Sequence, residues 1–324
     1  MWYIGNFDPP HSTENHVARA LRNNGDTVVL LQENAGAFES AISMLRHVGR
    51  PDFILWTRTR WGAEIHDANR PWAYMMLRYA RLLGVPVVGY HLDIWWGLKR
   101  ETEIEHEPFF ESTLLVTADG GHDDEWRNAG VNHLWMPPAI SLDEARLGTP
   151  RDEYRSLIAF VGSHDGGYHR EHRHRHELVD WLRRNYRRDC AFWPQPGHGA
   201  VRGDALQDLY ASVDVVVGDS CFAGTGLANY WSDRIPETIG RGGFLLHPDV
   251  PGLERHFSDG AHLRTWQAFD WDALHDGITW ALDNSDKRRA IALKGREHVL
   301  EHHTYERRMS DLVAELRSRG MVES

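Results

Sequence analysis

The sequence predicts an α/β protein made of two Rossmann-like, doubly wound domains that face each other across a cleft. Short apolar segments of strand length alternate with segments of helical periodicity, which is typical of parallel sheets with crossover helices. The alternation stops at the Pro137–Pro138 pair and restarts near Leu157. A chain of 324 residues is also longer than most single cores. We therefore expect one domain at residues 1–140 and a second at residues 141–324.

The first domain should contain six strands and three crossover helices. Ser12 or Thr13 can cap the first helix, and Asn24 with Gly25 ends it. Two more helices are predicted at residues 38–47 and 72–83, and Gly84 ends the second of these. The strands are predicted at residues 2–5, 27–32, 52–57, 85–90, 114–117 and 133–136.

The second domain repeats the alternation. Its strands are predicted at residues 157–161, 190–193, 213–217 and 244–247. Its long helices are predicted at residues 171–185, 203–212, 271–283, 287–302 and 305–317. In such folds, ligands bind at the carboxyl ends of the strands, so the loops that follow the strands are the places to look for a site.

Composition excludes several classes of protein. Hydrophobic residues make up 41% of the chain and charged residues 26%, which is typical of a soluble globular protein. The net charge of −11 argues against broad nucleic-acid binding, although a local basic groove remains compatible with it. No run approaches the ~20 apolar residues that span a membrane, and we expect no signal peptide before the first strand. Cys190 and Cys221, each beside apolar residues, suggest a reducing compartment, so we expect a cytoplasmic protein.

The segment from Tyr230 to Phe257, YWSDRIPETIGRGGFLLHPDVPGLERHF, is the most informative one. Ser232 and Asp233 are suitable helix caps, and a glycine-rich break precedes the next strand. Arg234 places a positive charge at the start of this short helix, where a diphosphate could bind. The Glu237 carboxylate could accept hydrogen bonds from the two hydroxyls of a ribose. Alternatively, Glu237 only complements the helix dipole and Arg234 is its surface partner.

This segment resembles the donor-binding motif of the group 1 glycosyltransferases of GT-B fold, (S)DRxxExxxxGGFLLxxxxxGLExxF. FVGSHDGGYH, residues 160–169, is similar to the glycine loop of their donor domain, and residues 295–313 resemble their terminal helices. The resemblance extends to the spore-maturation-type glycosyltransferases. It implies a GT-B fold, a hexosyltransferase-like activity, and last helices that cross back to the first domain. One position departs from the pattern: Asn229, eight positions before Glu237, replaces an acidic residue of the relatives.

Two further segments could bind the phosphates of the donor. The backbone of Gly162, Ser163 and His164 could approach a phosphate closely, because glycine carries no side chain there. In the run HREHRHRH, residues 169–176, Arg170 is the arginine nearest to this loop. We place Arg173 and Arg175 on a solvated helix face. His172 and His176, at i and i+4, have the spacing of metal ligands, but the fold class favours basic side chains and helix dipoles, so no metal or other cofactor is expected.

Candidate acceptor residues lie in two loops of the first domain, where Asp8 and His11 occur in NFDPPHS, and His91 and Asp93 in YHLDIWWG. Asp93 is the first candidate for the base that takes the proton of an acceptor hydroxyl, and His11 is the second. Each could instead be a helix cap or a loop residue. Trp95 and Trp96 could stack on an acceptor, although core packing is the commoner role of tryptophan. On a strand both cannot point inward, so one should meet the cleft or solvent.

These observations predict a glycosyltransferase that moves a sugar from a nucleotide diphosphate donor to an acceptor hydroxyl. UDP-linked sugars are among the expected donors. The acceptor could be a glycan, a small molecule, a protein side chain or a hydroxymethylated base in DNA. The alternative is a non-catalytic nucleotide-binding or sugar-binding module of the same fold. A dinucleotide oxidoreductase is disfavoured, because no G-x-G-x-x-G opens either half.

Overall fold

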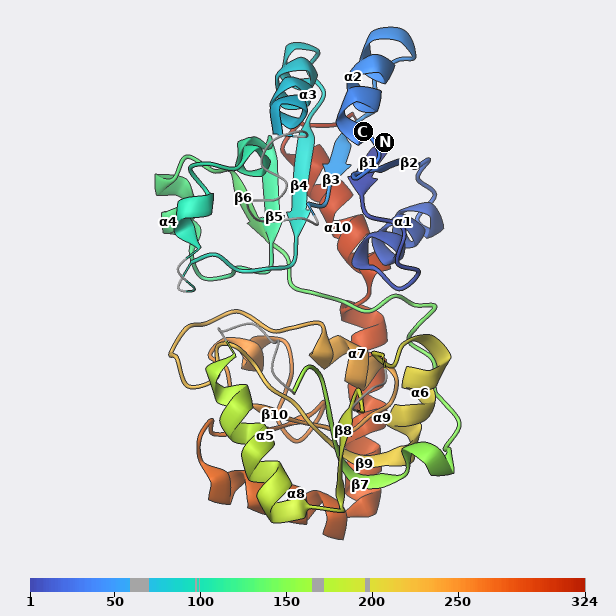
Figure 1. Ribbon diagram of the computed structural model, residues 1–324, viewed down its shortest axis with the longest axis vertical. Coiled ribbons are helices and arrows are strands. Elements are labelled where there is room, and N and C mark those ends of the chain that lie inside the picture. Colours follow the sequence, from blue (N-terminus) through green and yellow to red (C-terminus); the bar gives the residue numbers. More distant parts are fainter. Residues whose placement is uncertain (59–69, 97, 99, 165–171, 196–198, 324) are drawn as a thin grey trace. The chain divides into compact units, whose positions relative to one another are not determined.

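The computed structural model describes residues 1–323 except 59–69, 97, 99, 165–171 and 196–198 (Figure 1). The chain divides into two compact units. Unit 1 comprises residues 1–137 and 305–324, and unit 2 comprises residues 138–304. The break after Pro137 lies close to the predicted boundary at residue 140.

Unit 1 contains a six-stranded sheet in the order β2-β1-β3-β4-β5-β6, and all of its strand pairs are parallel. The strands are β1 (Trp2–Gly5), β2 (Val29–Gln32), β3 (Ile54–Trp56), β4 (Val87–His91), β5 (Leu114–Thr117) and β6 (His133–Trp135). The helices are α1 (Thr13–Asn23), α2 (Ala37–His47), α3 (Arg70–Leu82), α4 (Asp123–Asn128) and α10 (Tyr305–Ser318).

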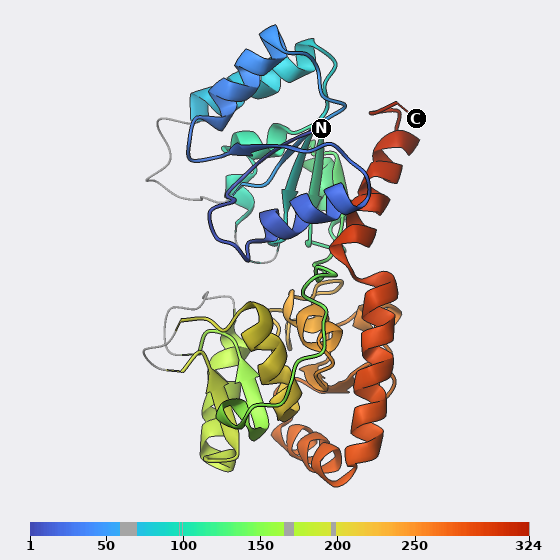
Figure 2. The same cartoon turned by 90° about the vertical axis from the view of Figure 1, so that its right-hand side faces the viewer.

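Helices cover both faces of this sheet. Helices α2 and α3 lie on one face and α1 with α10 on the other (Figure 2). Successive residues of β1 alternate between the faces, so Trp2 and Ile4 pack with the apolar sides of α2 and α3. The last helix is tied to α1, because Asn24 Nδ2 donates to the backbone oxygen of Glu306 at 2.8 Å. The C-terminal helix is therefore part of unit 1.

Unit 2 contains a five-stranded sheet in the order β11-β10-β9-β7-β8, again with parallel pairs throughout. The strands are β7 (Ser156–Val161), β8 (Cys190–Trp193), β9 (Val213–Val217), β10 (Leu245–Pro248) and β11 (Arg264–Trp266). The helices are α5 (Arg173–Tyr186), α6 (Gly203–Ser212), α7 (Arg234–Gly240), α8 (Trp271–Asp283) and α9 (Ser285–His302).

The strand order contains a topological switch point in each unit. In unit 2, β7 lies between β8 and β9, so the connections that leave β7 and β9 run in opposite directions across the sheet. In unit 1, β1 lies in the same way between β2 and β3. Open α/β sheets bind ligands at the carboxyl ends of the strands beside such a point. The loops after β7 and β9 are therefore the natural binding loops of unit 2.

The predicted class of two doubly wound α/β domains is confirmed. Among the strands and α-helices of the described residues, the three-residue strand β11 and the six-residue helix α4 were not predicted, because they are too short for a clear periodicity. Both cysteines are buried and form no disulfide. Within the described part of the chain, no helix has the length and apolar character needed to cross a membrane.

Candidate functional site

The centre of the binding end of unit 2 is the buried carboxylate of Asp219, just beyond β9. Its Oδ2 accepts hydrogen bonds from Arg175 Nε at 2.7 Å and His172 Nδ1 at 3.2 Å. Its Oδ1 accepts from His174 Nδ1 at 3.1 Å. Burial would raise the pKa of Asp219, but the bonds from His172 and His174 and the Arg175 charge hold that pKa well below its usual range. Asp219 is therefore an anion that gathers three basic side chains.

The three basic residues come from the start of α5, which faces the loop after β7. His172 occupies the N-cap position, and Arg175 lies in the first turn. Arg175 Nη1 is 3.5 Å from the backbone oxygen of Ser163, and Arg175 Nη2 is 3.0 Å from His172 Nδ1. The Arg175 and His172 side chains keep 14% and 13% of their surface exposed. A ligand at the switch point can therefore contact a guanidinium that the buried Asp219 carboxylate holds in position.

The predictions for the run 169–176 need correction at Arg175. We placed this arginine on a solvated helix face, but it pairs with a carboxylate that is only 3% exposed. Arg170, the predicted diphosphate ligand, lies outside the described residues. The i, i+4 pair does not converge, because His172 contacts Asp219 whereas His176 Nδ1 lies 3.3 Å from Asp180 Oδ2. Among the described residues, no group of three or more His, Cys, Asp or Glu side chains could hold a metal.

His174 is the structural member of this group. It is 2% exposed, and its ring stacks on Trp271 with centroids 5.7 Å apart and an angle of 12° between the rings. Its ring also meets the edge of Phe269 at 4.7 Å. Sequence reasoning did not select Asp219. The usable signal was an acidic residue immediately beyond the apolar strand VDVVVG, at the end of the sheet where ligands bind.

The described part of the glycine loop after β7, residues 162–164, offers backbone groups and the Ser163 hydroxyl. Gly162 N donates to the Trp193 oxygen at 2.8 Å, which anchors the start of the loop on β8. Ser163 is exposed. The His164 ring instead turns inward, 6% exposed, with Nδ1 2.9 Å from the Gly162 oxygen and its ring against Phe192. A ligand would therefore meet the backbone and Ser163 before the His164 imidazole.

Helix α7 holds the predicted ribose and phosphate residues on one short turn. Glu237 Oε2 lies 3.3 Å from Arg234 Nη1, and the two side chains are each 20% exposed. Arg234 Nη1 also approaches the Tyr210 hydroxyl at 3.4 Å. Asp233 occupies the N-cap position, but its side chain makes no capping hydrogen bond, which corrects the predicted capping role. Ser232, the other predicted cap, is partly buried just before it.

Asn229, which replaces the acidic residue of the resembling family, occupies a strained position. Its φ of +59° is in the left-handed region, and its N–H donates to the Pro251 oxygen at 2.8 Å. A Cβ added at Gly252, whose φ is +90°, would lie 2.1 Å from Asn229 Oδ1. The Asn229 amide is therefore packed over Gly252 and shapes the turn before Leu253.

The candidate acceptor residues lie at the carboxyl ends of β1 and β4 in unit 1. Asp8 and His11 are both exposed in the loop after β1, and Asp8 Oδ2 accepts from Gln32 Nε2 at 3.1 Å. Asp93, 42% exposed, forms an ion pair with Arg100 at 3.0 Å. His91 Nδ1 accepts the Asp93 N–H at 3.2 Å. Burial lowers the pKa of His91, which favours the neutral ring that this hydrogen bond requires.

The two tryptophans after Asp93 differ in burial. Trp95 is 1% exposed and packs edge-on against Phe110, with its Nε1 donating to Glu103 at 3.0 Å. The predicted acceptor contact of Trp95 is therefore corrected, because its ring belongs to the core. Trp96 is partly exposed and remains the candidate aromatic surface.

Asp119, just beyond β5, holds this tryptophan segment and was not selected from the sequence. Its Oδ2 accepts the backbone N–H groups of Trp95 at 2.9 Å and Trp96 at 3.0 Å. The residue is fully buried. Burial raises the pKa of Asp119 to about 6, against the opposing effect of the two N–H groups and of His122. The loop that carries Asp93 therefore rests on a buried carboxyl group.

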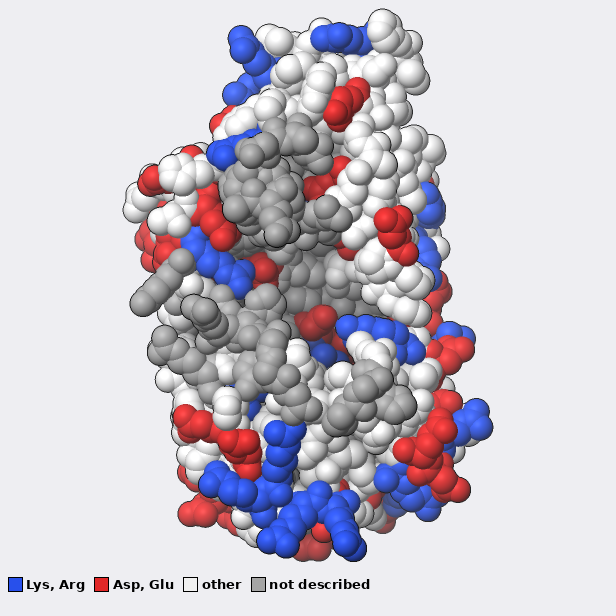
Figure 3. Space-filling view, viewed as in Figure 1, with Lys and Arg blue, Asp and Glu red and all other residues white. Residues whose placement is uncertain are grey.

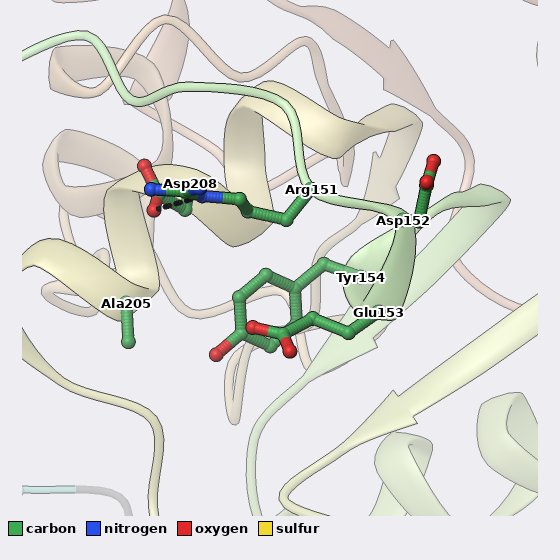
Figure 4. Close-up of a pocket in the computed structure, with 6 residues that line it drawn as sticks. All are labelled: Arg151, Asp152, Glu153, Tyr154, Ala205 and Asp208. Atoms are coloured by element: carbon green, nitrogen blue, oxygen red, sulfur yellow. Dashed lines mark hydrogen bonds and ion pairs between the residues drawn. The ribbon is translucent and has the colours of Figure 1, made fainter.

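The surface of unit 2 also has a shallow pocket elsewhere, shown in Figure 4. The cavity, of about 430 Å³, is lined by Arg151, Asp152, Glu153, Tyr154, Ala205 and Asp208. Arg151 Nε pairs with Asp208 Oδ2 at 3.1 Å across it. No predicted donor or acceptor residue lines this pocket, so it is separate from the binding loops.

Comparison with known proteins agrees with this architecture. A family model described as glycosyl transferase-like matches residues 170–314. HepE of Anabaena, solved in complex with UDP, is 10% identical over 97% of this chain and 99% of its own, with a TM-score of 0.60. An alpha-glucosyltransferase, solved with UDP and a 13-mer DNA containing an HMU base, is 10% identical over 97% and 98%, with a TM-score of 0.64.

A third solved structure is WaaG, a glycosyltransferase involved in lipopolysaccharide biosynthesis. It is 14% identical over 96% of this chain and 98% of its own, with a TM-score of 0.54. No curated protein matches the sequence of the chain. At these identities the structural likeness establishes the fold. The chain has the GT-B fold of glycosyltransferases, and its residues 170–314 match the glycosyl transferase-like family model.

Proposed function

We propose that the protein is a glycosyltransferase that moves a hexose from a nucleoside diphosphate donor to an acceptor hydroxyl. The observation that carries this proposal is the Arg175–Asp219 pair at the switch point of unit 2, where β7 and β9 end. A fixed arginine beside a glycine-containing loop suits a diphosphate, because the guanidinium donates several hydrogen bonds in one plane. UDP is the preferred nucleotide, since HepE and the alpha-glucosyltransferase were solved with it.

In this proposal the donor binds along the carboxyl ends of β7 and β9. The diphosphate meets the backbone of Gly162 and Ser163 and the exposed edges of Arg175 and His172. The Asp219 carboxylate keeps the guanidinium from reorienting when the donor arrives, so less side-chain entropy is lost on binding. The Asp219 carboxylate offsets part of the Arg175 charge, so the contribution of this arginine to phosphate binding is its directed N–H donors.

Glu237 is the proposed ribose ligand. Its carboxylate is held 3.3 Å from Arg234, which leaves the pair as a preformed polar unit on α7. Vicinal ribose hydroxyls would donate to the carboxylate, and Arg234 would stabilise its charge. Because α7 has only seven residues, we assign this role to the side chains and not to the helix dipole.

Asp93 is the proposed base for an acceptor hydroxyl, and His11 is the second candidate. Both side chains are accessible at the carboxyl ends of strands in unit 1. Trp96 would offer an aromatic face to a sugar or a base. The neighbour solved with DNA makes a hydroxymethylated base one of the acceptors to be screened, beside glycans, small molecules and protein hydroxyls. We place the reaction in the cytoplasm, where both buried thiols would stay reduced.

A thermal-shift screen tests the donor half of this proposal, because a ligand that binds only the folded protein raises its melting temperature. The screen uses UDP, GDP, dTDP and ADP with their common sugar conjugates. One nucleotide should give a clear shift that Arg175→Ala reduces and Arg184→Ala, an exposed arginine on the same helix, leaves intact. No shift with any nucleotide would contradict the donor site.

Release of free sugar from the donor tests the catalytic half. Without an acceptor, a transferase is expected to hydrolyse its donor slowly. With a suitable acceptor, it is expected to transfer the sugar. The non-catalytic alternative predicts a thermal shift without either reaction, so the two functions give different results with the same ligand.

A further inference from the structure

The outer face of α3 carries an exposed apolar stripe. Ten large hydrophobic residues are exposed in the described part of the chain. Three of them, Trp72, Met75 and Leu82, belong to α3, and a fourth, Val48, directly follows α2. Trp72, Met75 and Leu82 are 37%, 41% and 75% exposed, and partly buried Tyr79 lies between them in sequence. The spacing i, i+3, i+7, i+10 places these four on one side of a helix.

Three members of this stripe, Trp72, Met75 and Leu82, lie outside the core face of the same helix. Ala73, Met76, Leu77 and Ala80 are buried beneath α3, with the core of unit 1. Tyr79 packs against the edge of this core, whereas Trp72, Met75 and Leu82 are exposed beyond it. Scattered single apolar residues are normal on a surface, whereas four at helical spacing form a continuous feature.

Arginines border the stripe. The Arg46 guanidinium of α2 lies 4.7 Å above the Tyr79 ring, and Arg50 Nη1 donates to the Leu83 oxygen at 3.0 Å, at the end of α3. Arg78 and Arg81 are exposed on α3 itself, whose thirteen residues include no acid. Figure 3 shows basic side chains beside uncharged residues at this end of unit 1, with acidic side chains farther down the same face. This local excess of positive charge contrasts with the net charge of −11 of the whole chain.

We propose that the α3 face, defined by Trp72, Met75, Tyr79 and Leu82 with the bordering arginines, docks on an anionic lipid surface. An interfacial helix binds when apolar side chains enter the headgroup region while basic side chains contact anionic lipids. Tryptophan and tyrosine suit that region, because each has an apolar body and a polar edge. A nucleic acid would contact the arginines but would leave Met75 and Leu82 in water, so lipid fits the whole face better.

The docking would bring the acceptor-side unit to a membrane without a membrane-spanning helix. It does not depend on the proposed donor site, since none of the residues of the α3 face belongs to unit 2. Vesicle binding and sugar transfer can therefore fail separately.

Flotation of the full-length protein with vesicles tests the proposal. The protein should float with vesicles of phosphatidylcholine and phosphatidylglycerol, and much less with phosphatidylcholine alone. Replacing Trp72, Met75 and Leu82 together by serine should reduce the bound fraction on the order of tenfold, because each loses apolar area that the lipid would bury. Arg78→Glu with Arg81→Glu should abolish the preference for the anionic lipid.

The control is a variant with Leu157→Ser and Leu293→Ser, two leucines of unit 2 that are 43% and 54% exposed. It should float like the wild type. Circular dichroism verifies that each variant is folded. Equal flotation of the triple variant and this control would overturn the proposal, and so would absence of flotation with anionic vesicles. Retention of the wild type on duplex DNA, lost in the arginine variant and unaffected by the serine variant, would also overturn it.

Discussion

Arg175 donates a 2.7 Å hydrogen bond from Nε to the buried carboxylate of Asp219 and so joins the first turn of α5 to the end of β9. The bond fixes the plane of the guanidinium, whose remaining N–H groups lie beside the Ser163 oxygen and the His172 ring. The site therefore has a preformed cation where the strand order of unit 2 reverses.

Arg175→Ala is expected to raise the KM for the donor by about tenfold to a hundredfold, since hydrogen bonds to charged groups are worth about 1.5–3 kcal/mol. Steady-state kinetics at several donor concentrations measure it. Arg184→Ala on the same helix is the control and should leave KM unchanged. If Arg175→Ala had the donor KM of the wild type, the phosphate would have to bind elsewhere.

Asp219→Ala should destabilise the protein, because it leaves three basic side chains without their buried anion. Breaking a buried pair in this way costs about 3–5 kcal/mol, which chemical denaturation would detect. The double variant Asp219→Ala/Arg175→Met should recover part of that loss, because the unpaired buried charge is removed. Stability equal to that of the wild type would show that the pair contributes nothing to the fold.

Glu237→Ala is expected to raise the donor KM sharply while the fold stays intact, because both side chains of the pair are partly exposed and Arg234 keeps its contact with the Tyr210 hydroxyl. Glu237→Gln separates two roles. If the ribose hydroxyls donate to this side chain, glutamine should retain part of the affinity through its amide oxygen. A donor KM unaffected by both substitutions would limit Glu237 to its ion pair with Arg234.

Asp119→Asn and Asp119→Ala should differ in their effect on stability. Asparagine can still accept the N–H groups of Trp95 and Trp96, so at pH 7 it should fold at least as well as the wild type. Alanine leaves both N–H groups unpaired, which costs about 2 kcal/mol or more. Thermal unfolding measures both, and the acceptor KM should rise mainly for the alanine variant because the Asp93 loop rests on these bonds.

The sign of the pH effect at Asp119 follows from its raised pKa. The folded-state pKa of about 6 exceeds the unfolded value of 3.8, so the folded state holds the proton more tightly. The contribution of protonated Asp119 to the stability of the folded protein is complete below about pH 4 and disappears as the pH rises through 6. Asp119→Asn should lack this decline, and a decline identical to that of the wild type would assign it to another group.

His247 should make the stability fall in acid. Burial lowers the pKa of this fully buried imidazole to about 4 from 6.5, and its Nδ1 lies 2.7 Å from the Pro248 oxygen. The unfolded state therefore binds the proton first, and stability is lost as the pH falls from about 6.5 towards 4, by about 2 kcal/mol at pH 5. His247→Gln should be less sensitive between pH 7 and pH 5.

Melting curves of both proteins at several pH values measure this difference. Burial also lowers the pKa of His133 to about 3 and lowers the pKa of His91, His262 and His298, so the wild type loses stability from several groups as the pH falls. Only the part that disappears in His247→Gln is assigned to His247. Parallel curves for the two proteins would contradict the assignment.

The sequence by itself determined the two α/β halves, because each strand and helix has its own local periodicity and its own stop signal. Strands β5, β8 and β9 and helices α6 and α8 have the bounds that periodicity predicts. Proline at 137 and 138 marked the division, since it cannot continue a strand or helix. The binding ends of the sheets were also predictable, because parallel strands place their following loops at one edge.

Only the tertiary structure decided which side chains act together at those edges. Arg175 meets Asp219 across 44 positions of sequence, and Trp95 and Trp96 meet Asp119 across 24 and 23. The helix pattern shows that Arg175 lies on a polar face. It does not show that the buried carboxylate just beyond β9 lies within hydrogen-bond distance of this arginine. The physical reason is that a carboxylate can stay ionised in the interior only when distant donors surround it, and strand order brings those donors together.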